Sequence, residues 1–506
     1  MRTSGILMPV FSLASKYGIG TFGDKAYEFV DFLCLAGQSY WQILPLNPTS
    51  YGDSPYQSFS SAAGNPYFID LDLLNKDGLL ETKDYENVDF GSDSLCVDYE
   101  KLYINRFPVL KIAFNRFLNS VPEQFYTFCK EQADWLDEYA LFMAVKEHFG
   151  GLCWREWSDD FKFRKKTTLD KFKAEKKSEI AFYKFLQYEF YKQWSELKAY
   201  ANSKGIKIIG DMPIYVADDS ADVWSDTKQF DFDENLIPNV VAGCPPDAFS
   251  KDGQLWGNPV YNWKYMKNSE RPYEWWIKRM RNALKVYDVV RIDHFRGLES
   301  YYCIKYGNKT AKEGKWKKGP GMSLFKAFEK ELGKNLPIIA EDLGFLTDDV
   351  IKLLKKSGFP GMKVLQFAFD SREESDYLPH NYNKNCVVYT GTHDNDTIIG
   401  WSKNTKTDDV ETALNYMHLD NINNVNWDMI RLAMMSVADT AIFMMPDLLG
   451  LGDEGRINTP STIGDNWKWR IKDGCVNSWL AEIIKDMTAT YGRLSNYCKN
   501  NKNLGA

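Results

Sequence analysis

The chain has 506 residues and a formal net charge of −7, with 44% hydrophobic and 26% charged residues. These values are typical of a large globular protein, and the acidic balance argues against nucleic acid or an anionic membrane as a partner. We expect no export signal and no membrane span, because no apolar run reaches the roughly 18 residues that a span needs. Nine cysteines, an odd number without a C-x-x-C pair, predict reduced thiols in a cytoplasmic protein.

Eight short apolar runs separated by helical patterns are predicted to be strands. The run at residues 6–9 precedes a helix that Asp24 caps and Gly37 ends, and a later helix begins after Thr347 and ends before Gly358. The sixth strand is expected over residues 364–368. The strands lie near residues 6, 40, 207, 289, 338, 364, 387 and 441. Parallel strands alternating with helices predict an α/β fold, a (β/α)8 TIM barrel.

The spacing of these strands is uneven. About 160 residues separate the second strand from the third, and about 80 separate the third from the fourth, far more than one crossover helix requires. We therefore expect a mostly helical insertion over residues 48–205 and a second insertion over residues 212–288. Both follow the carboxyl end of a strand, so they would form walls around one face of a single catalytic barrel spanning residues 1–506.

A glycine pattern near the N-terminus has two interpretations. Gly18, Gly20 and Gly23 fit G-x-G-x-x-G at the start of a helix, as in dinucleotide-binding folds. That fingerprint needs a glycine directly after a strand and an acid about 20 residues further on. Here seven residues intervene and residues 41–45 contain no acid. A tight loop that enters a helix is the better explanation.

Four of the predicted strands end in a carboxylate. These are Asp211, Asp293, Glu341 and, through residues 390–393, Asp394. The carboxyl ends of parallel strands are where α/β folds bind their ligands. Acids at four such ends indicate one carboxylate-lined pocket, which is the chemistry of sugar transfer.

Asp293 and Glu341 have different sequence surroundings. Arg291 lies two residues before Asp293, on the same side of the strand, and a guanidinium there lowers the pKa of a carboxyl and keeps it ionised, as a nucleophile requires. A structural Arg–Asp pair fits the same spacing. Glu341 has apolar strand neighbours, so we expect its pKa to rise toward about 6–7, which suits a general acid and base. The alternative is that Glu341 is a surface acid near a helix.

Two of the five histidines in the chain, His294 and His393, adjoin these acids. A cluster of His and Asp also suits a metal ion. Neither H-x-x-x-H spacing nor a further ligand pattern accompanies them, so we expect no metal and no cofactor.

Two loops combine turn-forming residues with aromatic side chains. Residues 243–258 include Phe249 and Trp256 between prolines and a glycine, which is typical of a mobile lid. Residues 54–58 follow the second strand and include Tyr56, which is suited to contact sugar hydroxyls. Purely structural loops have a similar composition.

Taken together, these segments resemble the amylomaltases, also called disproportionating enzymes or 4-α-glucanotransferases, of glycoside hydrolase family 77 in the α-amylase superfamily. The resemblance runs nearly end to end. It is carried by residues 4–7, 41–46, 53–56, 210–216, 243–263, 291–297, 340–344, 390–397 and 466–470. It implies a (β/α)8 barrel with inserted subdomains after strands 2 and 3 and without a separate C-terminal β-domain. The partners it implies are α-1,4-glucans, such as maltooligosaccharides, starch or glycogen.

The resemblance also assigns roles to individual residues. Asp293 resembles the nucleophile, Glu341 the acid and base, and Asp394 the third carboxylate, which orients and stabilises the distorted sugar. The residues that match contacts at the bond to be cut are Arg291, His294 and His393. Those that resemble other subsite contacts are Tyr56, Asp211, Gln254, Trp256, Asp370 and Asn466. Some relatives carry an aromatic residue where this chain has Ala248, so Phe249 is expected to provide acceptor-side stacking alone.

The implied reaction is a retaining double displacement that transfers a glucan segment to the 4-hydroxyl of an acceptor. The two reacting carboxyl groups of a retaining pair lie about 5–5.5 Å apart, against about 6.5–9.5 Å for an inverting pair. An α-amylase-type glucan hydrolase has the same acids and differs only in its acceptor. A catalytically idle glucan-binding scaffold and, from the glycine pattern, a nucleotide-dependent oxidoreductase are the alternatives from other classes.

Overall fold

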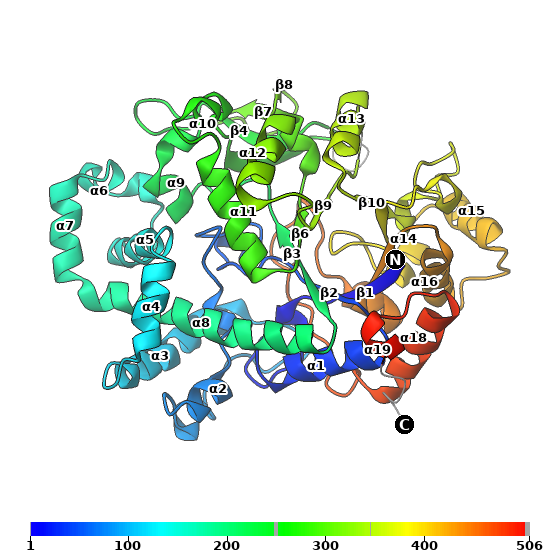
Figure 1. Ribbon diagram of the computed structural model, residues 1–506, viewed down its shortest axis with the longest axis horizontal. Coiled ribbons are helices and arrows are strands. Elements are labelled where there is room, and N and C mark those ends of the chain that lie inside the picture. Colours follow the sequence, from blue (N-terminus) through cyan, green and yellow to red (C-terminus); the bar gives the residue numbers. More distant parts are fainter. Residues whose placement is uncertain (1, 247–250, 345, 501–506) are drawn as a thin grey trace.

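The computed structural model describes residues 2–246, 251–344 and 346–500 and contains an eight-stranded parallel sheet (Figure 1). Its strands follow one another in the order β10-β11-β12-β1-β2-β3-β6-β9. Their bounds are β1 (Thr3–Leu7), β2 (Tyr40–Gln42), β3 (Lys207–Met212), β6 (Val289–Ile292), β9 (Ile338–Ala340), β10 (Gly361–Val364), β11 (Cys386–Tyr389) and β12 (Thr440–Met444). Each of the eight predicted strands is present, and the predicted barrel is confirmed.

The barrel closes between β9 and β10. The backbone N–H of Ala340 donates to the carbonyl oxygen of Pro360 at 2.9 Å. One step further along, the N–H of Met362 donates to Oδ1 of Asp342 at 2.6 Å. A side-chain carboxylate thus takes over where the ladder between these two strands ends, so neither strand is left with an open edge at this point.

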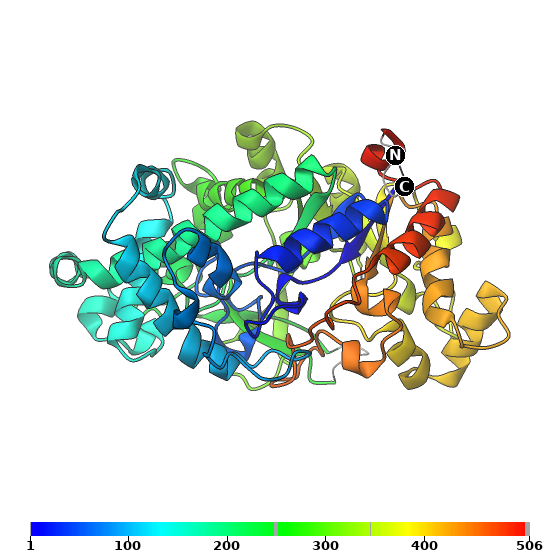
Figure 2. The same cartoon turned by 90° about the horizontal axis from the view of Figure 1, so that it is seen from below.

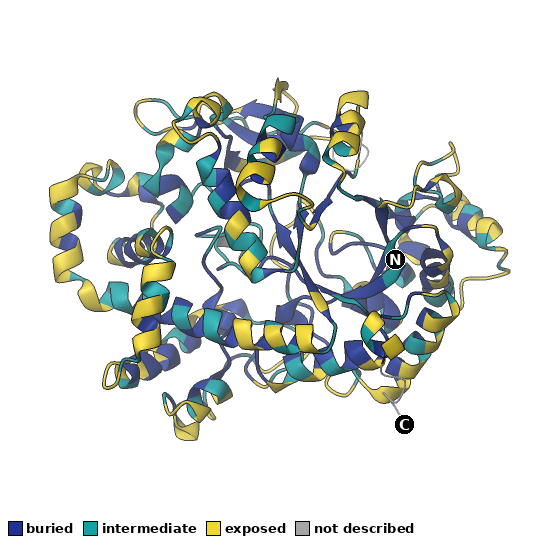
Figure 3. Cartoon of the chain, viewed as in Figure 1, coloured by how far each residue is buried: buried dark blue, intermediate teal, exposed yellow. Residues whose placement is uncertain are grey.

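Helices alternate with the barrel strands and cover their outer side. They are α1 (Asp24–Leu35), α11 (Glu274–Val286), α12 (Met322–Leu332), α13 (Asp348–Ser357), α14 (Ile398–Asn404), α15 (Thr407–Met417), α16 (Val425–Met435), α17 (Met445–Leu448), α18 (Ser478–Thr490) and α19 (Asn496–Asn500). Helix α13 follows its predicted pattern: it begins after Thr347, buries Val350 and Leu353, and ends at Gly358 with φ of 73°. Figure 3 shows the strands as the most deeply buried part of the chain.

The segment between β2 and β3 is mostly helical and lies to one side of the barrel (Figure 1). Its helices are α2 (Leu71–Lys76), α3 (Tyr99–Phe117), α4 (Glu123–Glu131), α5 (Leu136–His148), α6 (Asp159–Lys162), α7 (Lys166–Glu175) and α8 (Lys177–Ser203). The long helix α8 packs against α3, α4 and α5 and also against α1 and β3. It therefore joins the helical segment to the barrel wall.

A second, four-stranded antiparallel sheet has the order β5-β4-β7-β8. Its strands are β4 (Val240–Cys244), β5 (Gln254–Pro259), β7 (Ser300–Lys305) and β8 (Gly314–Lys318), and the short helices α9 (Ala221–Ser225) and α10 (Trp263–Asn268) flank β4 and β5. Two strands come from the segment after β3 and two from the segment after β6. The sheet thus joins two loops at the carboxyl face, a pairing that the sequence did not predict.

The sixth strand differs from its prediction. β10 covers Gly361–Val364, and a 3₁₀ turn at Leu365–Phe367 replaces the expected continuation. The turn is held by Gln366, whose Nε2 donates to the carbonyl oxygen of Asp396 at 2.7 Å. A short apolar run has the same sequence pattern in a strand and in a buried turn, so hydrophobic periodicity alone could not predict where β10 ends.

The glycine loop at residues 18–23 is explained by packing. A Cβ at Gly18, where φ is 76°, would lie 2.0 Å from the carbonyl oxygen of Phe90, and one at Gly20 would lie 1.9 Å from that of Val10. Backbone from two other segments therefore fills the space beside these glycines, as expected for a tight loop that enters α1. None of the helices in the described part of the chain has the length and hydropathy to cross a bilayer.

Arg493 forms hydrogen bonds at the N-terminal ends of two neighbouring barrel strands. Its buried guanidinium donates to five backbone carbonyl oxygens at 2.8–3.3 Å: those of Thr3, Met434, Ser436, Ala438 and Asp439. These carbonyls belong to the segments that lead into β1 and β12, which pair with each other. One side chain near the C-terminus thus holds the start of both strands.

We expect Arg493→Met to destabilise the protein by at least about 3 kcal/mol, because it removes five hydrogen bonds from a buried guanidinium at once. The thermal unfolding midpoint should fall clearly below that of the unaltered protein. Arg431→Met is the matched control, since Arg431 is half exposed and pairs only with Asp428 at 2.9 Å. Equal midpoints for the two variants would contradict this role of Arg493.

Candidate active site

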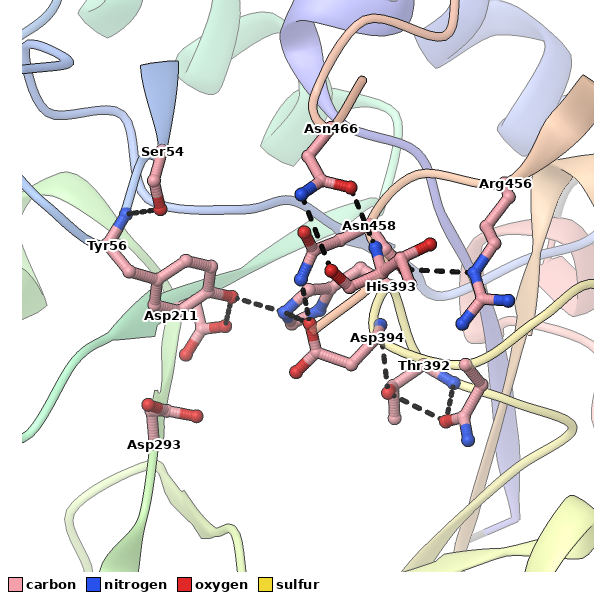
Figure 4. Close-up of polar contacts among 12 residues, drawn as sticks. Ser54, Tyr56, Asp211, Asp293, Thr392, His393, Asp394, Arg456, Asn458 and Asn466 are labelled. Atoms are coloured by element: carbon pink, nitrogen blue, oxygen red, sulfur yellow. Dashed lines mark hydrogen bonds and ion pairs between the residues drawn. The ribbon is translucent and has the colours of Figure 1, made fainter. Parts of the chain in front are cut away.

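The fold brings the four strand-end acids to one face of the barrel, and Figure 4 shows three of them, Asp211, Asp293 and Asp394. Asp211 lies in β3, and Asp293 and Glu341 directly follow β6 and β9. These strands are adjacent, with Asp211 paired to Arg291 and Arg291 paired to Ile339 in the ladder register. Asp394 reaches the same face from the loop after β11.

Arg291 lies at the centre of this group. Its Nη1 is 2.7 Å from both carboxylate oxygens of Asp211 and 3.1 Å from Oδ1 of Asp293. Its Nε donates to the sulfur of Met362 at 3.4 Å. The Arg291 side chain is only 4% exposed. One buried cation therefore faces two carboxylates, as the predicted alternation along β6 requires.

The net pKa shift of Asp293 is opposite to the one expected from the sequence. Burial raises the pKa of Asp293 to about 8, and Arg291 opposes this shift without overcoming it. The negative charges of Asp211, Glu341 and Asp394 raise the pKa of Asp293 further. The expected lowering was wrong because it considered only Arg291, whose charge is shared with Asp211.

Glu341 is held by two backbone donors. Its Oε2 accepts the N–H of His294 and its Oε1 accepts the N–H of Leu343, both at 2.7 Å. Burial nevertheless raises its pKa above the usual value, in the predicted direction, with Arg291 and the two backbone bonds opposing. Asp293 and Glu341 interact, so the raised pKa values describe a pair that retains a proton near neutral pH.

His294 connects Glu341 to the four-stranded sheet. It adopts a left-handed backbone conformation with φ of 51°, and its ring meets the Trp256 ring edge to face at 4.8 Å. Burial lowers the pKa of His294 to about 3, so its ring is neutral. In β5, Nε1 of Trp256 donates to Oε1 of Gln254 at 3.1 Å. The sheet thus places Trp256 beside the acids.

Tyr56 joins the two sides of the site. Its hydroxyl donates to Oδ2 of Asp211 at 2.6 Å and lies 2.8 Å from Nε2 of His393. The Tyr56 and His393 rings stack at 5.2 Å, and burial lowers the pKa of His393. His393 Nε2 lies 3.5 Å from Oδ1 of Asp394. A continuous polar chain therefore runs from Arg291 to Asp394.

Three predicted contacts lie apart from this chain or outside the described residues. Asp370 pairs with Arg372 on the surface, at 2.5 Å. Asn466 holds its own loop, because its Oδ1 accepts the N–H of Thr459 at 2.8 Å. Phe249 lies outside the described residues. Within the described ranges, no group of three or more His, Cys, Asp or Glu side chains is arranged to bind a metal ion.

Two residues of the site were not singled out from the sequence. Asn458 donates through Nδ2 to Oδ1 of Asp394 at 2.6 Å (Figure 4). Trp467 has φ of 65°, and its ring lies 5.7 Å from that of Tyr56 and 5.9 Å from that of His393. Both come from the irregular segment after α17, where no periodic pattern marks a contact. Their one signal is the motif at residues 466–470, which contains Trp467 but was interpreted only through Asn466.

The arrangement can supply both steps of a carboxylate-assisted group transfer. Three carboxyl groups meet at the carboxyl ends of the barrel strands. Asp293 is paired with Arg291, Glu341 has a raised pKa, and Asp394 is held by the amide of Asn458. The fold and the site define a (β/α)8-barrel enzyme with the groups that break and remake glycosidic bonds.

Comparison with known proteins identifies the family to which the chain belongs. The family model described as 4-alpha-glucanotransferase matches residues 8–476. The 4-alpha-glucanotransferase of Clostridium butyricum is 52% identical over 96% of this chain and all of its own length. That of Thermus thermophilus is 45% identical, covering 97% of this chain and 99% of its own. A solved amylomaltase from Streptococcus agalactiae, in complex with acarbose, has a TM-score of 0.94 at 44% identity, covering 97% of this chain and all of its own. The chain belongs to the 4-alpha-glucanotransferase family.

The raised pKa of Asp293 has a consequence for stability. A folded-state pKa above the unfolded one stabilises the protein below the unfolded value, and this contribution is lost as pH rises through about 8. Asparagine cannot ionise, so we expect the melting midpoint of Asp293→Asn to rise relative to that of the unaltered protein between pH 5 and about pH 8, and the difference to level off at higher pH. Asp376→Asn, at an exposed carboxylate, should show a constant difference. Parallel pH profiles of the melting midpoint for all three proteins would contradict the assignment.

Proposed function

We propose that this enzyme transfers α-1,4-glucan segments from a donor maltodextrin to the 4-hydroxyl of an acceptor glucan or glucose. The observation that carries the proposal is the meeting of Asp293 and Glu341 beside Arg291, with Asp394 near Asp293, at the mouth of the barrel. Membership of the 4-alpha-glucanotransferase family supports the same reaction. The complex of the Streptococcus agalactiae amylomaltase with acarbose supports a maltooligosaccharide-like ligand.

In the first step Asp293 attacks the anomeric carbon while Glu341 protonates the leaving oxygen. This step needs the shared proton on Glu341 and a negative charge on Asp293. The Arg291 contact favours the negative charge on Asp293, because its Nη1 lies 3.1 Å from Oδ1 of that carboxylate. The reducing-end fragment then leaves, and a covalent glycosyl-enzyme remains.

In the second step Glu341 acts as a base. It takes the proton from the 4-hydroxyl of a second glucan, whose oxygen attacks the anomeric carbon and displaces Asp293 with net retention. This reaction requires the two carboxyl groups to lie about 5–5.5 Å apart when substrate is bound. Regeneration of the proton on Glu341 returns the pair to its starting state.

We assign Asp394 to the sugar whose ring distorts during both steps. Asn458 fixes one of its oxygens at 2.6 Å, and the Asp394 side chain is 46% exposed, so its other oxygen is accessible to hydroxyl groups. His393 and His294 have lowered pKa values and are neutral. Nε2 of His393 is engaged by Tyr56, whereas the neutral His294 ring carries one donor and one acceptor suited to sugar hydroxyls. Neutral imidazoles also avoid adding charge beside the Arg291 cluster.

Further sugar contacts are assigned around this centre. The proposed residues are Tyr56, Asp211, Phe249, Gln254, Trp256, Asp370 and Asn466. Tyr56 and Asp211 are supported by their direct contact at 2.6 Å, and Trp256 by its contact with His294. Asp370 and Asn466 are proposed from the family resemblance, and Asn466 holds the loop that carries Asn458.

The inserted segments favour transfer over hydrolysis. We propose that residues 48–205 and 212–288 form walls that hold an acceptor glucan and limit water, with residues 243–258 as the lid. Holding the acceptor in reactive geometry can favour transfer by many orders of magnitude. The helical segment and the four-stranded sheet stand on two sides of the barrel in Figure 1. We also propose a cytoplasmic location, supported by nine cysteines that are all free thiols.

Incubation with maltotriose tests the reaction. We expect glucose together with maltodextrins longer than the substrate, because the acceptor is another glucan. Asp293→Asn should lower this activity by at least about 10³-fold, since no covalent intermediate forms. Asp376→Asn is the control for loss of a carboxylate outside the site, and circular dichroism checks the fold of each variant.

The product profile also separates the alternatives. Only shorter sugars would indicate an α-amylase-type hydrolase, and no product at all would indicate a glucan-binding scaffold. Near-normal transfer by Asp293→Asn would contradict its assignment as the nucleophile.

A further inference from the structure

Two cysteines that are 464 positions apart meet on the outside of the barrel. Cys34 lies near the end of α1, and Cys498 lies in α19, which packs beside α1 near the chain termini (Figures 1 and 2). Residues 36–39 follow Cys34 directly into β2. The pair therefore lies at the amino ends of the strands, on the opposite side of the barrel from the acids.

The Cys498 thiol lies against Cys34. It donates a hydrogen bond to the carbonyl oxygen of Cys34 at 3.1 Å. Both residues are buried, with exposed fractions of 4% and 9%. The Cys386 thiol makes the same kind of hydrogen bond at 3.1 Å, but to the carbonyl oxygen of Asn383, three residues away in its own loop.

The backbone around the pair is fixed from both sides. The N–H of Ser495 donates to the carbonyl oxygen of Gly37 at 2.9 Å, and the N–H of Cys498 donates to Oγ of Ser495 at 3.2 Å. Arg493, just before this segment, is anchored on five carbonyl oxygens. The last helix is thus held so that Cys498 faces Cys34.

The electrostatics of the contact make the two thiols unequal. Hydrogen bonds from Cys34 and Ser495 lower the pKa of Cys498 to about 6, although burial opposes the shift. The contact raises the pKa of Cys34 correspondingly. A thiolate next to a second thiol is the arrangement found in redox-sensitive cysteine pairs.

We propose that Cys34 and Cys498 form a redox modification site that reacts with low-molecular-weight disulfides to give an intramolecular disulfide bond. The Cys498 thiolate attacks one sulfur of the small disulfide, which forms a mixed disulfide and releases one thiolate. The Cys34 sulfur then attacks Cys498, loses its proton and releases the second small thiolate. Two protein thiols are oxidised, and one small disulfide is reduced to two thiols.

The bond would tie α19 to α1 and close nearly the whole chain into one loop. Such a cross-link restricts the unfolded chain, so the oxidised protein should melt at a higher temperature than the reduced protein. Because the pair lies away from the acids, the oxidised protein keeps its catalytic activity.

The test uses the full-length protein and oxidised glutathione at pH 7.5. We expect the protein to lose two of its nine thiols and to yield, without reductant, one linked peptide pair containing residues 34 and 498. Cys34→Ser should stop at a mixed disulfide on Cys498, and Cys498→Ser should keep its remaining thiols under the same exposure. Cys386→Ser is the matched control and should form the cross-link like the unaltered protein.

Either of two results would overturn the inference. One is an unaltered protein that keeps all nine thiols or cross-links at other positions. The other is Cys498→Ser losing thiols as fast as the unaltered protein, since that variant lacks the attacking thiolate. A reductant should reverse the cross-link and return the melting temperature to its starting value.

Discussion

The site depends on one buried cation among several acids. Arg291 is nearly inaccessible to solvent and divides its guanidinium between Asp211 and Asp293. Breaking such a pair leaves an uncompensated charge in a low-dielectric interior, which is strongly unfavourable. The parallel register of β3, β6 and β9 positions these groups, so the barrel and the charge cluster require each other.

This single cation cannot keep every neighbouring carboxyl group ionised. Burial and mutual repulsion raise the pKa values of Asp293 and Glu341, and the pair retains a proton. A double displacement needs one acid and one carboxylate at the same time, so the shared proton meets a chemical requirement. Tyr56 and the neutral His393 extend the network to Asp394 without adding charge.

The sequence predicted the barrel because buried parallel strands read as continuous apolar runs that end in acids. It did not predict β7 and β8, since β8 is a largely exposed, lysine-rich strand that pairs only with β7 in this sheet, and β7 joins the sheet through the distant β4. Asn458 and Trp467 lie in irregular backbone, and only the fold brings them to Asp394 and Tyr56. The direction of the Asp293 pKa shift could not be predicted, because it depends on the burial of the whole cluster. The Cys34–Cys498 contact could not be predicted either, because it depends on where the fold places two distant segments of the chain.

The central claim is that Asp293 bonds covalently to the donor sugar. The most direct test is trapping with a fluorinated α-maltosyl fluoride, a donor that forms a glycosyl-enzyme quickly and releases it slowly, followed by mass spectrometry of the digested protein. The account predicts one glycosyl adduct per chain, located on Asp293 and lost when an acceptor glucan is added. An adduct on another carboxylate, or turnover that inverts the anomeric centre without an adduct, would contradict it.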